Sequence, residues 1–261
     1  MAQEPDLPGV DISRPNIARV YDFFLGGTNN FPADRELAAN LLELDASIPR
    51  MVRDNRAFLT SAAARAALAG VEQFLDLGAG LPTYPSVHEA VRAVHPGARV
   101  AYVDNDSAVV RHTRALIAGS QGLSVAEADL TEPGAVLADP AVTAALDLAR
   151  PVCVIMAGVL YFLDAGSARD TVRGYAARLA RGSWLAVSVA RLDDTERAEA
   201  ESPVYTAATY HDHSAADLAH WFDGLDIVPP GIAEARRWIS GAGGTRGDGL
   251  VYPLCIVGIK R

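Results

Sequence analysis

The sequence is poor in cysteine, in long apolar runs and in positive charge. Cysteine occurs only as Cys153 and Cys255, each within a strand-like apolar segment, which favours buried free thiols in a reducing compartment over a disulfide framework. The apolar run at residues 151–163 is shorter than the roughly 18 residues that a membrane-spanning helix needs. The first residues are acidic and lack the apolar core of a signal peptide. We therefore expect a cytoplasmic protein without a membrane segment.

The shortage of positive charge also bears on partners. The 23 lysines and arginines are outnumbered by 32 aspartates and glutamates, which gives a formal net charge of -9. A broad nucleic-acid-binding surface needs an excess of basic residues, so no nucleic-acid partner is expected. Of the 261 residues, 50% are hydrophobic, enough for a sizeable core in one large domain or in a domain with an extension.

Several catalytic and metal-binding patterns are absent from the sequence. It contains no Walker A phosphate loop, no G-x-S-x-G nucleophile elbow and no Ser-His-Asp spacing. His211 and His213 form a His-x-His pair on an expected strand, but no third ligand lies near them in the sequence, so no metal site is predicted. A histidine acting as a general base stays open, and no catalytic residue can be named.

The beginning of the chain has a helical pattern. Residues 1–13 contain prolines and are expected to be a flexible leader. Apolar residues then recur at helical spacing in three segments, residues 16–27, 33–44 and 53–70. Gly70 is a typical helix stop. Residues 14–70 are therefore expected to form a helical extension ahead of the main fold.

From residue 71 onward, short apolar runs alternate with helical segments. The runs predict strands at residues 71–78, 99–106, 123–130, 151–163, 183–190, 225–232 and 253–261. The intervening patterns predict helices at residues 85–98, 107–120, 167–182 and 214–224, two of which begin with the capping pairs Ser86/Glu89 and Ser214/Asp217. This alternation is typical of a parallel sheet with helices on both faces.

The first expected strand ends in the turn Gly78-Ala79-Gly80, two residues after Asp76. In doubly wound α/β folds, ligands bind beyond the carboxyl ends of the strands, and glycine lets the backbone approach them closely. Asp104 stands at the tip of the second strand, 24 residues after Gly80 (104 - 80). A carboxylate there can accept hydrogen bonds from both hydroxyls of a ribose. We therefore expect a ligand with a nucleoside, unless Asp104 only caps the next helix.

The same turn argues against a dinucleotide. The dinucleotide-binding pattern G-x-G-x-x-G/A needs a third small residue, but Thr83 occupies that place. Tyr84 and Pro85 delay the next helix to about Ser86, so its N-terminus lies away from where a diphosphate would bind. A ligand without phosphates fits better.

S-adenosylmethionine (SAM) has the required chemistry. The backbone of the glycine turn can bind its carboxylate, and Asp76 can accept from its ammonium group through water. At the end of the third expected strand, Asp129 can accept from the adenine amine, and the backbone N–H of Leu130 can donate to a ring nitrogen. The alternative for Asp129 is a loop acid that caps the following turn.

The segments FLDLGAG, VAYVDND, EADL and CVIMAGVLYFL resemble, in order and spacing, motifs one to four of class I SAM-dependent methyltransferases. The segments RPNIARVYDFFLGGTNNFPADR and RDNRAFL further resemble a bacterial family of predicted S-adenosyl methyltransferases, most of which have no assigned acceptor. This resemblance spans roughly residues 14–261. It implies an α/β fold, a Rossmann-like doubly wound sheet of seven strands whose last strand is antiparallel, with an N-terminal helical extension before a SAM-binding core at residues 71–261.

The resemblance also implies SAM as cofactor and S-adenosylhomocysteine (SAH) as product. Carried over residue by residue, it places the SAM site at Asp76, Gly78, Ala79, Gly80, Asp104, Asn105, Asp129 and Leu130, with Ala157, Gly158 and Val159 on the sulfonium side. The fourth motif is apolar and lacks the Asn/Asp-Pro-Pro-aromatic signature of enzymes that methylate amino groups. That departure argues against N-methylation of nucleobases or glutamine.

The N-terminal extension has two interpretations. It is either a helical connection packed on the sheet or a cover that closes over the cofactor. In the second case Tyr21 can face the sulfonium by cation–π attraction, and Asn29, Asn30 and Arg56 can contact the methionine carboxylate or the acceptor. The charged residues 188–203 form a solvated segment or the rim of an acceptor pocket. The glycine-rich residues 240–249 are expected to connect the last two strands.

These observations favour a SAM-dependent methyltransferase that acts on an unidentified small-molecule acceptor. One alternative is a nicotinamide-dependent oxidoreductase on a Rossmann core. Another is a protein that binds SAM without catalysis, which a plugged cleft above Gly158 would favour. The oligomeric state cannot be inferred from the sequence.

Overall fold

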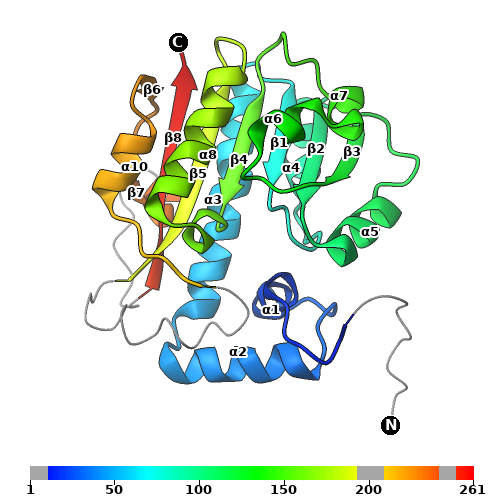
Figure 1. Ribbon diagram of the computed structural model, residues 1–261, viewed down its shortest axis with the longest axis vertical. Coiled ribbons are helices and arrows are strands. Elements are labelled where there is room, and N and C mark those ends of the chain that lie inside the picture. Colours follow the sequence, from blue (N-terminus) through cyan, green and yellow to red (C-terminus); the bar gives the residue numbers. More distant parts are fainter. Residues whose placement is uncertain (1–10, 193–208, 241–250) are drawn as a thin grey trace.

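The computed structural model describes residues 11–192, 209–240 and 251–261. Most of the expected leader and of the two polar segments after the fifth and sixth expected strands lies outside these ranges. Within them, helices cover both faces of a central sheet, and two further helices lie along the edge where the parallel strands end (Figure 1).

The sheet follows the strand order β3-β2-β1-β4-β5-β8-β6. Its strands are β1 (Gln73–Leu77), β2 (Arg99–Asp104), β3 (Leu123–Glu127), β4 (Cys153–Ala157), β5 (Trp184–Leu192), β6 (Leu225–Ile227) and β8 (Val251–Lys260). Strands β1 to β5 pair in parallel, whereas β8 is antiparallel to both β5 and β6. The predicted seven-stranded sheet with an antiparallel last strand is confirmed, and a two-residue strand, β7 (Ala233–Glu234), also pairs with β8.

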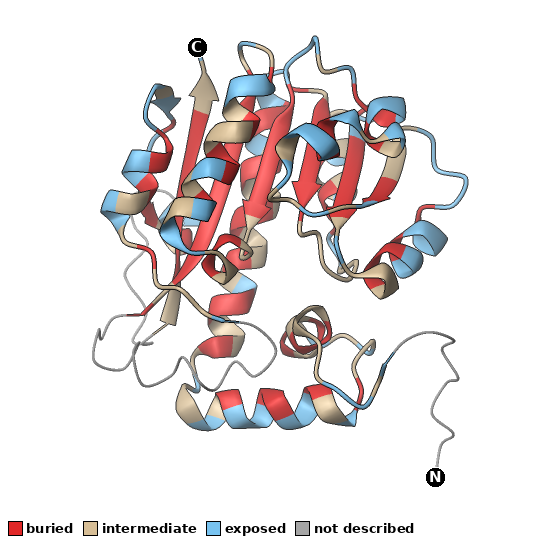
Figure 2. Ribbon diagram, in the orientation of Figure 1, coloured by how far each residue is buried: buried red, intermediate tan, exposed pale blue. Residues whose placement is uncertain are grey.

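The strands are buried on both faces because successive side chains point to opposite sides. In β4, Val154 and Met156 pack into one core and Cys153 and Ile155 into the other. The first core includes helices α6 (Pro133–Ala138), α7 (Pro140–Ala145), α8 (Ala165–Arg178) and α10 (Ala215–Trp221). The second includes α3 (Ile48–Leu68), α4 (Val87–Val94), α5 (Ser107–Leu116) and α11 (Ala235–Ser240). Figure 2 shows this continuous buried interior.

The N-terminal segments form three helices, α1 (Ile17–Phe24), α2 (Pro32–Leu44) and α3. Helix α3 packs on the sheet and extends past its edge, where α1 and α2 lie (Figure 1). A buried ion pair joins the first two helices, with Arg19 Nε 2.8 Å from Asp34 Oδ2. The same Asp34 carboxylate accepts from the backbone N–H groups of Asn16 and Phe31. Side chains therefore hold the α1–α2 connection in one shape.

The structure extends or shortens several predicted elements. Helix α3 begins at Ile48 instead of 53, since Pro49 is well tolerated in a first helical turn. The fourth strand ends at Ala157, where Gly158 has a φ of 74°, and the 3-10 turn η1 (Leu160–Phe162) follows. The short elements α6, α7, α11 and β7 were not predicted. The segment with His211 and His213 is not a strand.

Predictions from local sequence patterns agree better with the structure than the predicted element boundaries do. Both predicted capping boxes are present, since the Ser86 hydroxyl accepts from Glu89 N–H and the Ser214 hydroxyl from Asp217 N–H. Cys153 and Cys255 are buried free thiols, as predicted. No helix in the described ranges is long and apolar enough to cross a membrane.

Candidate functional site

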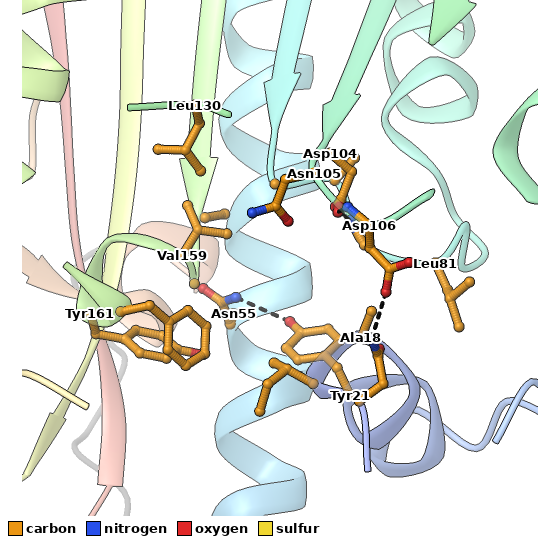
Figure 3. A pocket seen from close by; sticks show the side chains of 18 of the residues that line it. Ala18, Tyr21, Asn55, Leu81, Asp104, Asn105, Asp106, Leu130, Val159 and Tyr161 are labelled. Carbon is orange, nitrogen blue, oxygen red and sulfur yellow. Dashed lines mark hydrogen bonds between the residues drawn. The ribbon is translucent and has the colours of Figure 1, made fainter. Parts of the chain in front are cut away.

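A cavity of about 510 Å³ opens where the parallel strands end and α1 crosses the sheet edge (Figure 3). Its volume lies within the roughly 300–1,000 Å³ typical of small-molecule sites. Of the residues that the sequence places at a SAM site, the lining includes Tyr21, Gly78, Ala79, Gly80, Asp104, Asn105, Asp129, Leu130, Ala157, Gly158 and Val159. Only Asp76 of that set is not in the lining.

The glycine turn has a shape that larger residues would prevent. Gly78 and Gly80 have φ angles of 64° and 62°, in the left-handed region that glycine adopts without strain. A Cβ atom on Gly78 would lie 2.4 Å from Cγ1 of Val159. The N–H groups of Gly78 and Ala79 both donate to the carbonyl of Val103 in β2. The turn therefore brings bare backbone against the loop after β4.

Asp104 connects the glycine turn to the start of α5. One carboxylate oxygen accepts from the N–H of Gly80 at 2.8 Å, and the other accepts from the N–H of Asp106 at 2.9 Å. Burial raises the pKa of Asp104, and these backbone donors act in the opposite direction. Asn105 contributes a third backbone hydrogen bond, and the carboxylate, which has about four lone-pair sites, can still accept from a ligand.

The loop after β3 is held from two sides. One Asp129 oxygen accepts from both the N–H and the hydroxyl of Thr131, at 2.8 and 2.7 Å. The carbonyl of Leu130 accepts from the Tyr175 hydroxyl on α8 at 3.1 Å. Among the described residues, the second Asp129 oxygen and the Leu130 N–H have no hydrogen-bond partner, and both residues line the cavity.

Asp76 lies beneath the turn. It is 2% exposed and lines a separate small pocket that shares Arg56, Ala79 and Gly80 with the main cavity. Burial raises the pKa of Asp76 to about 7; the charge of Asp104 adds to the increase, while Arg56 opposes it. Asp76 therefore changes its charge in the neutral pH range.

The polar candidates of the N-terminal extension separate in the structure. Arg56 lines the cavity, and its Nη2 donates to the carbonyls of Thr83 and Pro85 at 2.6 and 2.8 Å, while its Nε is buried without a partner in the described structure. Asn29 and Asn30 do not line the cavity. Instead, both donate to the carboxylate of Asp22 within the turn after α1.

Several lining residues were not predicted from the sequence. They are Pro15, Asn16, Ile17, Ala18, Asn55, Leu59, Leu81, Thr83, Asp106, Thr131, Tyr161, Phe162 and Leu163. Asn16 could have been noticed as a helix cap: its side chain accepts from Arg19 N–H and donates to Asp106 at 2.5 Å. Leu81, Thr83, Asp106 and Thr131 lie close in sequence to predicted site residues, whereas Asn55 and Leu59 have no local signal, because the packing of a distant helix brings them to the cavity.

The two histidines contact the backbone of the turn after β4. His213 is buried, and its Nε2 lies 3.1 and 3.0 Å from the carbonyls of Leu160 and Leu163. The N–H of His211 donates to the carbonyl of Tyr161. Within the described ranges, no group of three or more His, Cys, Asp or Glu side chains could hold a metal ion. The pair braces the turn after β4.

Comparison with known proteins identifies relatives of this chain. A family model described as S-adenosyl methyltransferase matches residues 3–255. The chain is 32% identical to a DUF574 family protein from Streptomyces avermitilis, with a TM-score of 0.89 over 96% of this chain and 99% of that one. It is 33% identical to a predicted methyltransferase from Thermobifida fusca, with a TM-score of 0.88 over 97% of this chain and 98% of the other.

A more distant likeness shows the fold alone. Magnesium protoporphyrin IX methyltransferase from Synechocystis PCC 6803, solved with bound SAH, has a TM-score of 0.51 at 14% identity, over 82% of this chain and 87% of that one. No curated protein matches the sequence. The match over nearly the whole chain shows that the protein belongs to the S-adenosyl methyltransferase family, whose members are SAM-dependent methyltransferases (EC 2.1.1.-).

Proposed function

We propose that the cavity at the carboxyl ends of the strands binds SAM and that the chain transfers its methyl group to a small-molecule acceptor. The observation that carries this proposal is the hydrogen bond between Gly80 N–H and Asp104. It holds the glycine turn and a carboxylate suited to a ribose together on one wall of the cavity. Residues 71–261 form the SAM-binding core in this proposal, and residues 14–70 form its cover.

The nucleoside part would be held by side chains at two strand ends. Asp104 can still accept a hydrogen bond from the ribose, and Asn105 lies beside it in the lining. Asp129 has an oxygen for the adenine amine, and the N–H of Leu130 can donate to a ring nitrogen. A Cβ atom on Gly80, which has a positive φ, would meet only the Cβ of Ala18 at 4.0 Å, so the turn leaves open space beside Asp104 that fits the nucleoside.

The amino-acid tail would lie over the glycine turn. The N–H groups of Gly78, Ala79 and Gly80 already donate to Val103 and Asp104, contrary to the expectation that they bind the carboxylate. The guanidinium of Arg56, whose Nε has no partner in the described structure, suits a carboxylate instead. Asp76 is buried below the turn, so it would act on the ammonium group by charge or through water. The pKa of Asp76 is raised because burial disfavours the ionised carboxylate, and a bound cation would favour it.

When bound, SAM supplies a methyl group on a positively charged sulfur. Residues Ala157 to Val159 and the ring of Tyr21 would enclose that end. Among the described residues, no histidine or lysine lines the cavity. Alignment of the acceptor and exclusion of water would therefore provide most of the catalysis, and good alignment is worth about 7–11 kcal/mol.

The structure does not favour the alternatives. Helix α4 begins at Val87, seven residues beyond Gly80 (87 - 80), so no helix N-terminus stands at the turn to bind a diphosphate. A nicotinamide dinucleotide therefore has no phosphate site there. Gly158 borders the open cavity, and no described side chain plugs the space above it. A non-catalytic SAM-binding protein is thus not supported either.

Calorimetric titration with SAM, SAH and NADH tests the proposal. Wild type is expected to bind SAM and SAH but not NADH, and Asp104→Ala is expected to bind SAH at least about tenfold more weakly, or about 1.4 kcal/mol. Asp170→Ala, an exposed aspartate on α8, serves as the control and should leave the affinity unchanged. Binding of NADH in preference to SAH would contradict the proposal.

A further inference from the structure

A chain of hydrogen bonds runs from β5 through α3 to the cover helix α1. The hydroxyl of Ser188 donates to Oδ1 of Asn55 at 2.5 Å, and Nδ2 of Asn55 donates to the hydroxyl oxygen of Tyr21 at 3.0 Å. The Tyr21 hydroxyl in turn donates to the carbonyl of Val52 at 3.1 Å. Figure 3 shows the Asn55 and Tyr21 side chains pointing toward each other at the cavity wall.

These hydrogen bonds have only one consistent donor-to-acceptor direction. Tyr21 gives its single proton to Val52, so it must accept from Asn55, and this sets the orientation of the Asn55 amide. Asn55 is 4% exposed and Ser188 is fully buried, so an unpaired group at either position would be costly. The network therefore holds Tyr21 in one orientation.

Asn55 also lies against the loop that follows β4. A Cβ atom on Gly158 would be 2.8 Å from Nδ2 of Asn55, and the N–H of Gly158 donates to the carbonyl of Ser188. The network and the loop at the expected sulfonium side thus occupy adjacent space. Asn55, Tyr21 and Gly158 all line the cavity.

The direction of these hydrogen bonds determines what Tyr21 can do. Its proton points to a backbone carbonyl, and burial raises the pKa of its hydroxyl, so it is not a general base. Its ring and the remaining lone pair of its oxygen are the electron-rich parts that can face the cavity. Such groups attract a positively charged ligand and are indifferent to a neutral one.

We infer that Asn55 is a positioning residue that, through Tyr21, makes the cavity distinguish the positive sulfonium of SAM from the neutral thioether of SAH. This inference rests on the proposed function. It assigns Asn55, which has no local sequence signal, to recognition of the donor's charge. A residue that only holds the fold together would affect both ligands equally.

The test compares the dissociation constants of SAM and SAH for wild type, Asn55→Leu, Tyr21→Phe and the double variant. In Asn55→Leu, the preference for SAM over SAH is expected to fall about fivefold, as the loss of a partly desolvated cation–π contact would produce. Tyr21→Phe keeps the ring but removes the hydroxyl bonds to Asn55 and Val52 that orient it, so it should lower the preference by a similar factor. In the double variant Asn55→Leu should add no further loss, because both changes act on one contact.

Controls separate this inference from the proposed function. Asn40→Leu makes the same substitution at an exposed position of α2 and should leave both constants unchanged. If Asn55→Leu does not fold, Ser188→Ala tests the same hydrogen bonds, because it releases the Asn55 amide. This variant should also lower the preference for SAM over SAH. Equal weakening of SAM and SAH overturns the inference alone. Failure of wild type to bind either ligand overturns the proposed function.

Discussion

At the scale of single residues, Asp76 is a buried carboxyl group whose charge depends on pH. Burial raises its pKa from the ordinary 3.8 to about 7. The unfolded chain releases this proton near its ordinary pKa, whereas the folded protein keeps it until about pH 7. The group therefore lowers the free energy of unfolding as pH rises from about 4 to about 7. Bound cationic ligand has the opposite preference, because it favours the ionised carboxylate.

This linkage predicts a pH dependence of SAH binding. Near one unit below its pKa only about one Asp76 carboxyl in ten is ionised, so the affinity should rise about tenfold between pH 6 and pH 8. Calorimetry at pH 6 in buffers of different ionisation enthalpy should detect release of close to one proton.

Asp76→Asn is the matched control for that measurement, since it keeps the shape and removes the titration. Its SAH affinity should stay nearly constant over the same pH range. A wild-type affinity that is equal at pH 6 and pH 8 would show that Asp76 does not sense the ligand.

At the scale of elements, the connection between α1 and α2 depends on one buried carboxylate. Asp34 is fully buried and accepts from Arg19, Asn16 and Phe31. Asp34→Ala removes the carboxylate that neutralises Arg19 and that two backbone donors need, so the free energy of unfolding should fall by about 3–5 kcal/mol in urea denaturation.

The exposed pair of Asp170 with Arg169 provides the comparison. Its aspartate side chain is 70% exposed, and Asp170→Ala should change stability by less than about 0.5 kcal/mol. If both variants unfold at the same urea concentration, the Asp34 cluster does not stabilise the N-terminal helices.

Elements also differ in how well the sequence predicts them. The helix starts at Ser86 and Ser214 were predictable because a cap involves residues only three apart. Helices α6 and α7 were missed because six residues are too few for a helical period to appear. Asn55 and Ser188 are 133 residues apart in the sequence, so no local pattern could have related them.

At the scale of the whole molecule, the question is whether α1 must move for the cofactor to enter. Helix α1 lies across the strand ends and lines the cavity, and Asn16 links it to Asp106 at the start of α5. If release of SAH requires α1 to open, hydrogen exchange of its amides should slow about 100-fold at a SAH concentration of 100 times the dissociation constant.

Helix α7, at the far side of the sheet beside β2 and β3, provides the reference for exchange. Its amides should slow much less than those of α1. Equal slowing of both helices would mean that SAH acts only through global stability, and α1 would then be a fixed wall of the cavity instead of a lid.

The sequence alone determined the fold class, the turn at Gly78 and Gly80, and the carboxylate of Asp104. These features follow from short-range patterns, namely the alternation of strands with helices and the position of polar residues at strand ends. Tertiary structure alone decided that Asn55 reaches the cavity, that the N-terminal candidates Tyr21 and Arg56 line it while Asn29 and Asn30 do not, and that Asp76 lies beneath it. The reason is that helices from the N-terminal region pack across a sheet edge built from distant residues, and long-range packing leaves no periodic signal in the chain.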